Sequence, residues 1–522
     1  MEPLLPEWRQ RAAPRPLDPL QIAQLARTLA IPELVARLLV LRGLTEPAVL
    51  REFLEPSLQQ LLDPSQMADM ERGVAVLCAA LEQDVPIAVQ GDYDADGITS
   101  TALLVRFLGE AGGRVLPYLP ERERDGYGLS TRGVQLAAEQ GAKVLVAVDC
   151  GTSDHEVVAL ASELGLAVVV VDHHPPSGTL PTHAAAVLNP ARLDCGFAAR
   201  TLSAAGVTFF LLIALRRRLR ETGWWARRGR PEPNLRRMLD LVTLGTVADV
   251  VPLVGQNRIL VAHGLGELSR RATPGLCALC DKAGVGAEVS VLDVSYRLAP
   301  RLNAAGRMGS AQASLELLTA AGIARATELA RQLEAHNDER KLLQERVEAE
   351  ALSEIGSGKH VTDSVLVLAR EGWHPGVVGI VASRLAERYY LPAVVIALQD
   401  GLGKGSARSI DGVDIGQAIQ GCRNHLIRGG GHAQAAGITL QAEAVQSFAA
   451  ALARRVQAML AGKRLLPALL FDAQVRLAEL DGPLVEWIGR MAPFGAGNPE
   501  PVLVVSGARM RHRRILKGLH LQ

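Results

Sequence analysis

Aromatic side chains are scarce in this chain of 522 residues, of which they make up 4%. Proteins that hold single-stranded nucleic acid by base stacking need exposed aromatic rings, so few such platforms can be present. The formal net charge of +1 excludes a protein that coats nucleic acid through its overall charge, so any nucleic-acid site must be a local patch. No run of residues approaches the roughly 20 consecutive apolar side chains of a membrane-spanning helix.

Cysteine is also rare, with six residues scattered along the chain. The first residues, MEPLLPEWRQRAAPRPLDP, combine prolines with charges and lack the apolar core of a signal peptide. We therefore expect free thiols and a cytoplasmic protein. The single Cys-x-x-Cys motif, Cys277 to Cys280, has no second pair nearby, which argues against a zinc site.

Short apolar runs rich in β-branched residues alternate with helical stretches from Pro86 onwards. The run AVVVVD is apolar until its final aspartate, as expected of a central parallel strand that is covered on both faces. This alternation predicts an α/β domain with a doubly wound parallel sheet. Before it, prolines break the first 80 residues into short helical segments.

A second α/β region begins near Ser364, where SVLVLAR and PAVVIAL are expected to be strands and GVVGIVASRLAERYY the helix between them. The two regions are separated by ATELARQLEAHNDERKLLQERVEAEALSEI, which has no Gly or Pro and predicts one long connecting helix. Beyond about residue 463 the chain is again β-like and carries many Arg and Lys residues. Those charges suit either a solvated surface or a groove for a phosphate backbone.

The stretch IAVQGDYDADGITS gathers three aspartates, Asp92, Asp94 and Asp96, at the end of an apolar run. Side chains two residues apart on an extended segment share a face. Three carboxylates on one face repel one another unless a cation holds them. The alternative is a polar turn after a strand, closed by Gly97, and the stretch by itself does not decide between the two.

Three later stretches favour the cation. VLVAVDCGTS places Asp149 at the end of a predicted strand, VVVVDHHPP places Asp172, His173 and His174 at the end of another, and LVTLGTVADVVPL places Asp249 after a fourth. A lone aspartate in such a position is more often a turn residue, and a lone histidine is more often a hydrogen-bonded core group. Four such stretches at strand ends of one α/β domain indicate a shared site, because open sheets bind ligands there.

The composition of this set indicates its chemistry. Carboxylates mixed with imidazole suit Mn²⁺ or a related first-row ion better than Mg²⁺ or Ca²⁺, which favour shells of oxygen. The acids are too many for one ion, whereas two ions about 3.5–4 Å apart and bridged by a carboxylate would use them all. Such a pair stabilises the attacking and leaving oxygens of an in-line phosphoryl displacement. The sequence therefore predicts hydrolysis of a phosphoester or phosphoanhydride.

The motifs DYDADG, VDCGTS, VDHH and GTVADVVPL resemble those of the DHH phosphoesterase superfamily. In order with them come PERERDGYGLS, RLNAAGRMGSAQASLELL, LEAHNDERKLLQE, GWHPGVVGIVASRL, GKGSARS, GGGHAQAAG and MAPFGAGNPEPVL. Together these resemble the RecJ family of single-strand-specific DNA exonucleases over essentially the whole chain. The implied domains are an N-terminal helical segment (1–80), a DHH phosphoesterase domain (81–320), a connecting helix (321–358), a DHH-associated domain (359–462) and an OB-fold (463–522) with about two or three of its five strands.

The resemblance assigns roles at the matching positions. The residues implied to bind metal are Asp94, Asp96, Asp149, His173 and Asp249. Asp149 is expected to bridge two ions, Mn²⁺ or Mg²⁺, and Asp92 to lie at the edge of the site as a ligand or its support. His174 is expected to face the scissile phosphate and to stabilise its charge or protonate the leaving oxygen. Asp172 is expected to hydrogen-bond one of the two histidines. The residues assigned to catalysis are His174, Asp149 and Asp92.

Phosphate and DNA binding are assigned to residues of both α/β regions. The implied set is Arg122, Arg301, Asn303, Ser406, Arg408, Gly430, Gly431 and His432. Arg122, Ser406 and Arg408 correspond to the family's site for the 5′-phosphate, which a planar guanidinium can bind bidentately. The glycines of GGGHAQAAG offer bare backbone N–H groups, although glycines also serve tight turns. Arg307 either lines the path of the strand or forms a surface ion pair.

The implied activity is that of a metal-dependent 5′-to-3′ exonuclease that degrades single-stranded DNA to 5′-mononucleotides in recombination and repair. Single-strand-binding protein and a RecQ-type helicase are implied partners, and the chain is expected to be a monomer. Two alternatives stay open: a DHH enzyme for small substrates such as oligoribonucleotides or cyclic dinucleotides, and a non-catalytic binding module. The first generally lacks the N-terminal segment and the OB-fold entry found here, and the second has lost metal ligands that are intact here.

One local feature stands apart from these motifs. The segment from Leu215 to Arg237 holds nine arginines together with Trp224 and Trp225. This composition suits a grip on nucleic acid or a solvated helix and loop, and the second interpretation is favoured.

Overall fold

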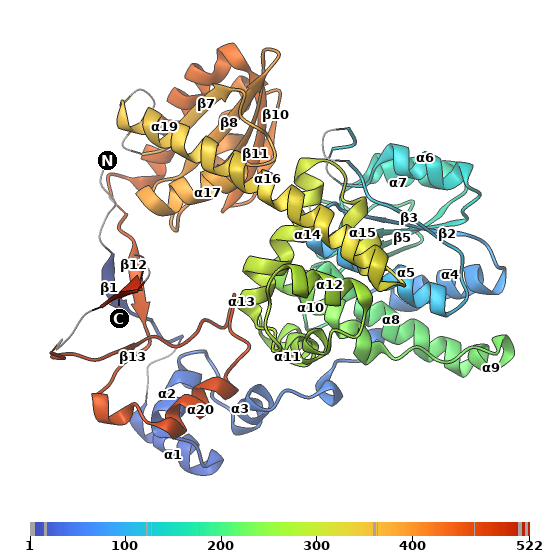
Figure 1. The fold of residues 1–522 in the computed structure, drawn as a ribbon, viewed down its shortest axis with the longest axis horizontal. Helices are drawn as coiled ribbons and strands as arrows, with labels where there is room; N and C mark the ends of the chain where they lie inside the picture. The colour runs from blue at the N-terminus through green and yellow to red at the C-terminus, as the bar shows by residue number, and fades with distance from the viewer. Residues whose placement is uncertain are drawn as a thin grey trace. The chain divides into compact units, whose positions relative to one another are not determined.

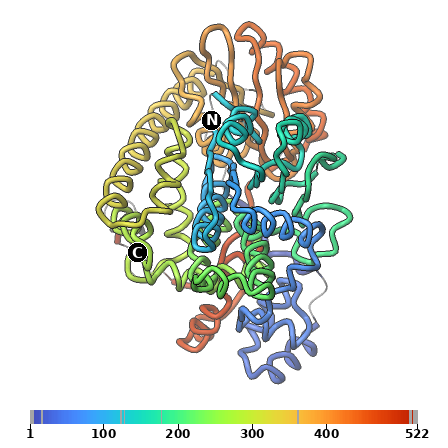
Figure 2. The backbone as a smooth tube through the Cα atoms, turned by 90° about the vertical axis from the view of Figure 1, so that its right-hand side faces the viewer, coloured from blue at the N-terminus to red at the C-terminus, as the bar shows by residue number. Residues whose placement is uncertain are grey.

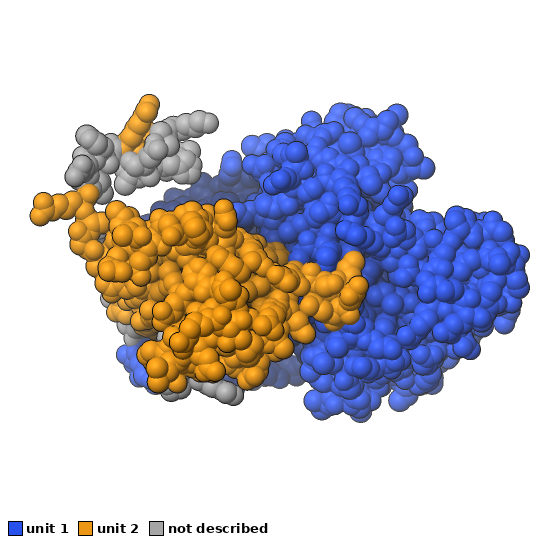
Figure 3. All heavy atoms as spheres, turned by 90° about the horizontal axis from the view of Figure 1, so that it is seen from below, with its two compact units in different colours: residues 1–5, 61–467 blue, residues 6–60, 468–522 orange. Residues whose placement is uncertain are grey.

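The chain divides into two compact units, which Figure 3 shows in different colours. One unit contains residues 61–467, and the other is built from two segments far apart in the sequence, 6–60 and 468–522. The computed structural model describes residues 6–14, 18–121, 124–126, 128–176, 178–358, 362, 364–463, 465–509, 514–516 and 520–521. No helix within these ranges is long and apolar enough to cross a membrane.

A five-stranded parallel sheet in the order β3-β2-β4-β5-β6 forms the first part of the larger unit (Figure 1). Its strands are β2 (Ile87–Gly91), β3 (Val115–Tyr118), β4 (Val144–Val148), β5 (Ala167–Val171) and β6 (Ala186–Leu188). Every residue of β2 and β4 is buried, and most are β-branched or small, which suits strands that are packed on both faces. The prediction of a doubly wound parallel sheet is confirmed.

Helices cover both faces of this sheet. On one face α4 (Met70–Glu82), α5 (Ala95–Glu110) and α8 (Ala204–Glu221) pack together, and on the other lie α6 (Thr131–Glu139) and α7 (His155–Glu163). After β2 the chain passes through α5 to β3 on one side, and then crosses to β4 on the other side of β2. The connections therefore diverge at the carboxyl ends of β2 and β4, which is where open α/β sheets bind their ligands.

A run of helices follows the sheet, and one of them corrects the sequence prediction. The helices are α9 (Trp224–Arg228), α10 (Leu239–Ala248), α11 (Gly255–Arg270), α12 (Pro274–Lys282), α13 (Val291–Asp293), α14 (Ala299–Met308) and α15 (Gln312–Leu318). The prediction that LVTLGTVAD is a strand is wrong, because these residues form α10 and its carboxyl end. Helix α10 packs against α5, α8 and α11, so it has no polar stripe. A short run that is apolar on all sides has the same pattern in a buried strand and in a buried helix.

The predicted long helix is α16 (Ile323–Gly356), which has 34 residues (Figure 2). It leads to a second five-stranded sheet. This sheet has the order β10-β11-β9-β8-β7, and only β7 and β8 are parallel. Its strands are β7 (Leu366–Glu371), β8 (Ala393–Gln399), β9 (Leu402–Arg408), β10 (Arg428–Gly431) and β11 (Ala435–Gln441). The accompanying helices are α17 (Val378–Tyr389), α18 (Ile415–Gln420) and α19 (Val445–Leu460). Both predicted strands and the helix between them are confirmed.

The smaller unit joins the two ends of the chain. Its N-terminal helices are α1 (Pro19–Leu29), α2 (Glu33–Val40) and α3 (Pro47–Leu54), and they share a core with α20 (Gly482–Arg490). Strand β1 (Glu7–Gln10), which the sequence did not predict, pairs in parallel with β12 (Ala468–Phe471). The predicted β character after residue 463 is confirmed by β12 and by two further short pairs, β13 (Ala473–Gln474) with β14 (Leu503–Val504) and β15 (Ile515–Leu516) with β16 (His520–Leu521).

Candidate metal centre

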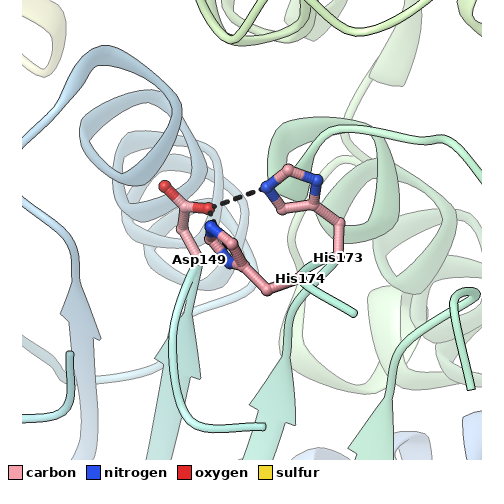
Figure 4. Close-up of side chains that lie close together, drawn as sticks. All are labelled: Asp149, His173 and His174. Atoms are coloured by element: carbon pink, nitrogen blue, oxygen red, sulfur yellow. Dashed lines mark ion pairs between the residues drawn. The ribbon is translucent and has the colours of Figure 1, made fainter. Parts of the chain in front are cut away.

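Aspartates follow three neighbouring strands of the first sheet at the point where each strand ends. Asp92 follows β2, Asp149 follows β4 and Asp172 follows β5. Because the carboxyl ends of parallel strands lie along one edge of the sheet, the three side chains are brought to that edge. His173 and His174 come directly after Asp172, and Figure 4 shows both imidazoles turned toward the Asp149 carboxylate.

Helices bring three further aspartates to the same edge. Asp94 is the N-cap of α5, Asp96 lies in the first turn of that helix, and Asp249 is the C-cap of α10. His173 Nε2 lies 3.2 Å from Asp149 Oδ1, 3.6 Å from Asp249 Oδ2 and 4.0 Å from Asp96 Oδ2. The site therefore combines residues from strand ends, a helix start and a helix end.

Three groups of these side chains are compact enough to hold a metal ion. They are Asp149 with His173 and His174, Asp96 with His173 and Asp249, and Asp92 with Asp94 and Asp149, each with its ligand atoms within 4.8 Å of one another. Asp149 belongs to two of the groups, as a bridging carboxylate would, and so does His173. The structure thus brings together every residue that the sequence predicted as a metal ligand.

One buried atom tests whether a cation fits here. His173 Nε2 is buried and makes no hydrogen bond to any part of the chain that the structure describes, although three carboxylates lie around it. An imidazole nitrogen that makes no hydrogen bond and lies among carboxylate oxygens is part of a typical ligand set for a first-row divalent ion. The donor set therefore fits the predicted metal.

The start of α5 explains the spacing of the motif DYDADG. Asp94 Oδ1 accepts hydrogen bonds from the backbone N–H groups of Asp96 (3.0 Å) and Gly97 (3.2 Å), so this carboxylate also caps the helix. A Cβ atom on Gly97 would lie 2.5 Å from both the N and O atoms of Asp92. Gly97 therefore allows the helix to begin directly against the strand end, which keeps Asp92, Asp94 and Asp96 together.

The position of Asp249 depends on close helix packing. Asp96 accepts hydrogen bonds from the first N–H groups of α8, those of Ala204 (2.7 Å) and Ala205 (2.9 Å). A Cβ atom on Gly245 would lie 2.5 Å from Asp96 Oδ1, so α10 touches Asp96 at a glycine one turn before Asp249. Gly245 has no chemistry of its own, and the sequence prediction missed its role because only the packing of α10 on α5 reveals it.

Asp149 has an unusual backbone. Its φ angle is +61°, in the left-handed region that aspartate tolerates better than most residues do. Gly151, two residues later, also has a positive φ of 106°. Such conformations recur at functional sites, where the surrounding structure holds them. Here the Asp149 N–H is held by the carbonyl of Val171 at 3.0 Å.

Asp172 contacts the imidazole of His174 and not that of His173. Asp172 Oδ1 lies 2.8 Å from His174 Nδ1, and it also accepts hydrogen bonds from the backbone N–H groups of both histidines. Its Oδ2 accepts from the N–H of Thr152. Asn189, which the sequence prediction missed, completes this network by donating from Nδ2 to Thr152 Oγ1 and to the carbonyl of His174, each at 2.9 Å.

The carboxylates repel one another in the absence of a cation. Burial and the charges of Asp94 and Asp96 raise the pKa of Asp149 well above its usual range, and burial with the charges of Asp249 and Asp94 does the same to the pKa of Asp96. Burial and Asp94 raise the pKa of Asp249 to about 7. A site in which buried carboxylates raise one another's pKa in this way is suited to receive positive charge.

The pKa values of the two histidines are shifted in opposite directions. Burial and the neighbouring charge of His174 lower the pKa of His173 to about 4, which leaves its imidazole neutral and able to bind a metal. Burial also lowers the pKa of His174, but the hydrogen bond and charge of Asp172 outweigh this effect and raise that pKa to about 9. His174 is therefore protonated at neutral pH and can donate a proton.

Asp249→Asn is expected to change stability with pH in metal-free protein. Because the pKa of Asp249 is raised from 3.8 to about 7 on folding, the folded state binds more protons than the unfolded state between these values. The stability due to this proton is present below about pH 4 and is lost as pH rises to about 7, by about 1.4 kcal/mol per unit of pKa shift. In EDTA the variant should therefore melt above the wild type at pH 8, and the gap should narrow toward pH 5.

The control for this measurement is added Mn²⁺. The ions stabilise ionised carboxylates, so with Mn²⁺ at pH 8 the wild type should melt above the variant, in the reverse of the order in EDTA. A difference between the two chains that stayed constant from pH 5 to pH 8 in EDTA would contradict the raised pKa of Asp249.

In the second sheet, Ser406 and Arg408 lie together on β9. Arg408 Nη1 donates to Ser406 Oγ at 2.8 Å. A Cβ atom on Gly379, in the first turn of α17, would lie 3.0 Å from Ser406 Oγ and 3.2 Å from Arg408 Nη2. A guanidinium, a hydroxyl and the start of a helix are suited to a phosphate. Arg122, the third predicted member of this site, lies outside the described residues.

Three predicted residues of α14 have contacts within the protein. Arg301 forms a partly buried ion pair with Glu334 of α16, with Nε to Oε2 at 2.5 Å. Asn303 Oδ1 accepts the backbone N–H of Ala95 at 2.7 Å. Arg307 Nη1 donates to the carbonyl of Gly376 at 3.2 Å. The DNA contacts assigned to these side chains stay predictions, whereas their structural contacts are observed.

The glycine motif GGGHAQAAG forms a hairpin at the edge of the second sheet, where β10 pairs with β11. Gly431 has a φ of +156°, and a Cβ atom there would lie 2.3 Å from the carbonyl oxygen of Ala435, so no other residue fits. Gly430 has open space where a Cβ would stand, and His432 is exposed. The binding of phosphate by Gly430, Gly431 and His432 stays a prediction.

The tryptophans of the arginine-rich segment do not face solvent. Trp224 and Trp225 are 2% and 8% exposed, and Trp224 Nε1 donates to the carbonyl of Ala111. Several of the arginines pair with acids, such as Arg220 with Glu232. Buried rings cannot stack on bases, so this segment is the solvated helix and loop that the sequence analysis favoured.

Family models match three parts of the chain. The DHH family, N-terminal domain, matches residues 86–246, the DHHA1 domain matches residues 362–458, and the RecJ OB domain matches residues 471–522. The first match covers the parallel sheet with its aspartates, the second covers the sheet with Ser406 and Arg408, and the third lies in the smaller unit.

Individual proteins and structures agree with these models. The single-stranded-DNA-specific exonuclease RecJ of Dickeya dadantii is 40% identical over 94% of this chain and 86% of that protein. The RecJ of Escherichia coli is 37% identical over the same shares of the two chains. The crystal structure of Thermus thermophilus RecJ in complex with Mn²⁺ superposes with a TM-score of 0.83 at 31% identity, and the match covers 99% of this chain and 72% of that one. The complex of the same protein with Mg²⁺ has a TM-score of 0.74 at 30% identity, and the match covers 95% of this chain and 67% of that one.

The likeness extends from the sequence to the order of the domains and to the fold. It spans both sheets, the long helix between them and the smaller unit, and it includes relatives whose solved structures hold Mn²⁺ or Mg²⁺. The site in which six aspartates meet two histidines thus stands in a chain that belongs to the RecJ family of single-stranded-DNA-specific exonucleases.

Proposed function

We propose that this protein is a metal-dependent 5′-to-3′ exonuclease that degrades single-stranded DNA to 5′-mononucleotides in DNA recombination and repair. The observation that carries the proposal is the carboxylate–histidine site, in which Asp149 and His173 are each shared by two ligand groups. Such sharing suits two adjacent ions at the ligand-binding edge of the sheet. The names of the relatives supply the substrate class.

Two ions, Mn²⁺ or Mg²⁺, are the cofactors that the site fits. The residues that would hold them are Asp92, Asp94, Asp96, Asp149, His173 and Asp249. When bound, a pair of divalent ions supplies Lewis acidity to the phosphodiester and lowers the pKa of the attacking water. The neutral imidazole of His173 and the left-handed turn at Asp149 prepare the chain for this role.

His174 supplies the proton that completes the reaction. Hydrolysis at the first phosphodiester forms a bond between the water oxygen and phosphorus and breaks the bond from phosphorus to O3′ of the terminal nucleotide. That O3′ leaves with the electron pair and needs a proton. His174 is protonated at neutral pH because Asp172 holds Nδ1 at 2.8 Å, so its Nε2–H is the group that can protonate the leaving oxygen.

The Ser406–Arg408 pair is proposed to bind the 5′-phosphate. A phosphate anchored there and a metal site on the other sheet make cleavage start at an end and not within the strand. Arg122 is proposed to join this site, and Gly430, Gly431 and His432 to contact the backbone of the strand. The proposal also includes the domain boundaries predicted from the sequence, action as a monomer in the cytoplasm, and single-strand-binding protein and a RecQ-type helicase as partners.

The activity is tested with two 3′-labelled single-stranded oligonucleotides, one with a 5′-phosphate and one with a blocked 5′ end, in Mn²⁺ and in EDTA. We expect mononucleotides only from the open end and only in Mn²⁺. Cleavage of dinucleotides but not of longer strands would instead support a small-substrate enzyme. Strand binding without cleavage, by folded protein that Mn²⁺ stabilises, would support a non-catalytic binding module.

Arg408→Ala is expected to lower kcat/KM on 5′-phosphorylated DNA by about 10- to 100-fold, because a hydrogen bond to a charged group contributes about 1.5–3 kcal/mol. The loss should be much smaller on DNA with a 5′-hydroxyl, since that substrate has no phosphate to bind. Arg346→Ala, an exposed arginine of α16, is the matched control and should leave both values unchanged. Equal losses on the two substrates would contradict a 5′-phosphate site at Arg408.

A further inference from the structure

Helix α14 touches the metal loop with two of its residues. Asn303 Oδ1 accepts the backbone N–H of Ala95 at 2.7 Å, and Ala95 stands between the ligands Asp94 and Asp96. One turn later, a Cβ atom on Gly306 would lie only 2.6 Å from the carbonyl oxygen of Tyr93. The helix is therefore in backbone contact with the loop that carries three of the carboxylates.

The last turn of α14 touches the second α/β region in a similar way. Arg307 Nη1 donates to the carbonyl of Gly376, in the loop between β7 and α17. In the opposite direction, a Cβ atom on Gly376 would lie 2.5 Å from the carbonyl oxygen of Arg307. Three residues after Gly376, Gly379 packs against the Ser406 and Arg408 side chains. A short chain of contacts thus leads from α14 to the candidate phosphate site.

The body of α14 is held in place between these contacts. Leu302, Ala304 and Ala305 are fully buried. Ser314 of α15 donates through Oγ to the carbonyl of Leu302, and the partly buried ion pair between Arg301 and Glu334 ties α14 to α16. A helix that is packed on all these elements transmits position without bending, because a close-packed core deforms little.

We propose that α14 is a spacer that sets the separation between the metal site and the Ser406–Arg408 pair, and thereby the length of the product. Gly306 and Gly376 are positioning residues in this proposal, because their missing side chains let α14 touch both loops directly. The inference rests on the proposed exonuclease function. When the 5′-phosphate of a strand is bound at the Ser406–Arg408 pair, the length of the spacer decides which phosphodiester of that strand reaches the carboxylates.

The central test is Gly376→Ala, which inserts a methyl group where the Arg307 carbonyl now stands. The loop before α17, and with it the phosphate site, must move away from α14, whereas the carboxylates do not touch the new atom. We expect dinucleotides and longer products to appear among the mononucleotides, and kcat/KM to fall by about 10- to 100-fold, as for a misplacement near 1 Å. The rise in Tm on adding Mn²⁺ should equal that of the wild type, because the metal site is unchanged.

Gly306→Ala provides the opposite case, since its methyl group would displace the Tyr93 carbonyl in the metal loop. In that variant the Mn²⁺-dependent rise in Tm should itself shrink. Gly266→Ala is the matched control, because Gly266 is an exposed residue within helix α11 and has open space at its Cβ position. This control should keep the product length, the rate and the Mn²⁺ response of the wild type.

Arg307→Met disrupts the same contact without inserting an atom into the loop. This variant replaces Gly376→Ala in the test if Gly376→Ala does not fold. It removes the hydrogen bond to Gly376 and should also lengthen the products. If folded Gly376→Ala, or Arg307→Met, released only mononucleotides, the proposal that α14 is a spacer would be overturned. Failure of the proposed function itself is distinguishable, because the wild type would then release no nucleotides from any strand.

Discussion

Asp149→Asn is expected to lower the rate of nucleotide release by about 10³-fold or more, since a loss of several kcal/mol of metal-based stabilisation corresponds to at least that factor. Asp149 is shared by two of the candidate ligand groups, so its loss weakens both at once. Asparagine is the suitable replacement because it adopts the left-handed backbone that Asp149 has, with φ of +61°. Alanine at this position would add backbone strain to the chemical effect.

The measurement combines single-turnover rates in Mn²⁺ with melting curves in EDTA and in Mn²⁺. In EDTA the variant should melt at or above the wild-type Tm, because a repelling carboxylate has been removed. The rise in Tm that Mn²⁺ gives the wild type should be lost. Asp338→Asn, an exposed change on α16, is the control and should alter neither quantity. A normal Mn²⁺ response in Asp149→Asn would exclude Asp149 as a ligand.

His174→Gln is expected to slow cleavage by about 10²- to 10⁴-fold, the range for loss of a general acid. The Mn²⁺ response should be reduced far less than in Asp149→Asn, because Asp96, His173 and Asp249 form a ligand group without His174. His155→Gln, an exposed histidine at the start of α7, is the matched control. A leaving group of low pKa, which needs no proton, should restore much of the rate of His174→Gln. Absence of this rescue would contradict the acid role.

The dependence of the cleavage rate on pH distinguishes the role of His174 from that of Asp172. Because the hydrogen bond and charge of Asp172 raise the pKa of His174, the proton is present at neutral pH and the rate in Mn²⁺ should fall in the alkaline range. Asp172 makes the largest contribution to this rise, so in Asp172→Asn the pKa of His174 falls and the decline in rate should begin at lower pH. The rate of this variant at neutral pH should fall by about 10- to 100-fold, as for loss of a residue that orients a metal-site histidine. A decline in rate that began at the same alkaline pH in Asp172→Asn as in the wild type would contradict the role of Asp172 in raising the pKa of His174.

Much of the candidate site follows from local sequence pattern. Asp92, Asp149 and Asp172 each come directly after a run of apolar, β-branched residues, and such runs predict parallel strands. The carboxyl ends of parallel strands meet at one edge of a sheet, so the pattern alone places residues about 80 positions apart in one site. The long helix α16 was equally predictable, because it contains neither proline nor an internal glycine.

Other features depended on contacts that no local pattern contains. Asp249 was predicted to follow a strand, yet it ends helix α10, whose apolar run has the same pattern in either structure. The sequence did not predict that the side chain of Asn303 accepts the N–H of Ala95. Trp224 and Trp225 lie in an arginine-rich segment and nevertheless are buried. In each case the partner stands far away in the sequence.

The sequence by itself determined which aspartates and histidines form the candidate cation site. The reason is that the periodicity of strands and helices depends on side chains that are neighbours along the chain. It also determined the family, through motifs that occur in a fixed order. Only the tertiary structure decided how closely the elements approach, as at Gly245, Gly306 and Gly376, where the absence of a side chain allows backbone contact. It likewise decided that residues 6–60 share a unit with residues 468–522. The physical reason is that packing joins surfaces of distant segments, and their fit depends on three-dimensional shape and not on any pattern along the chain.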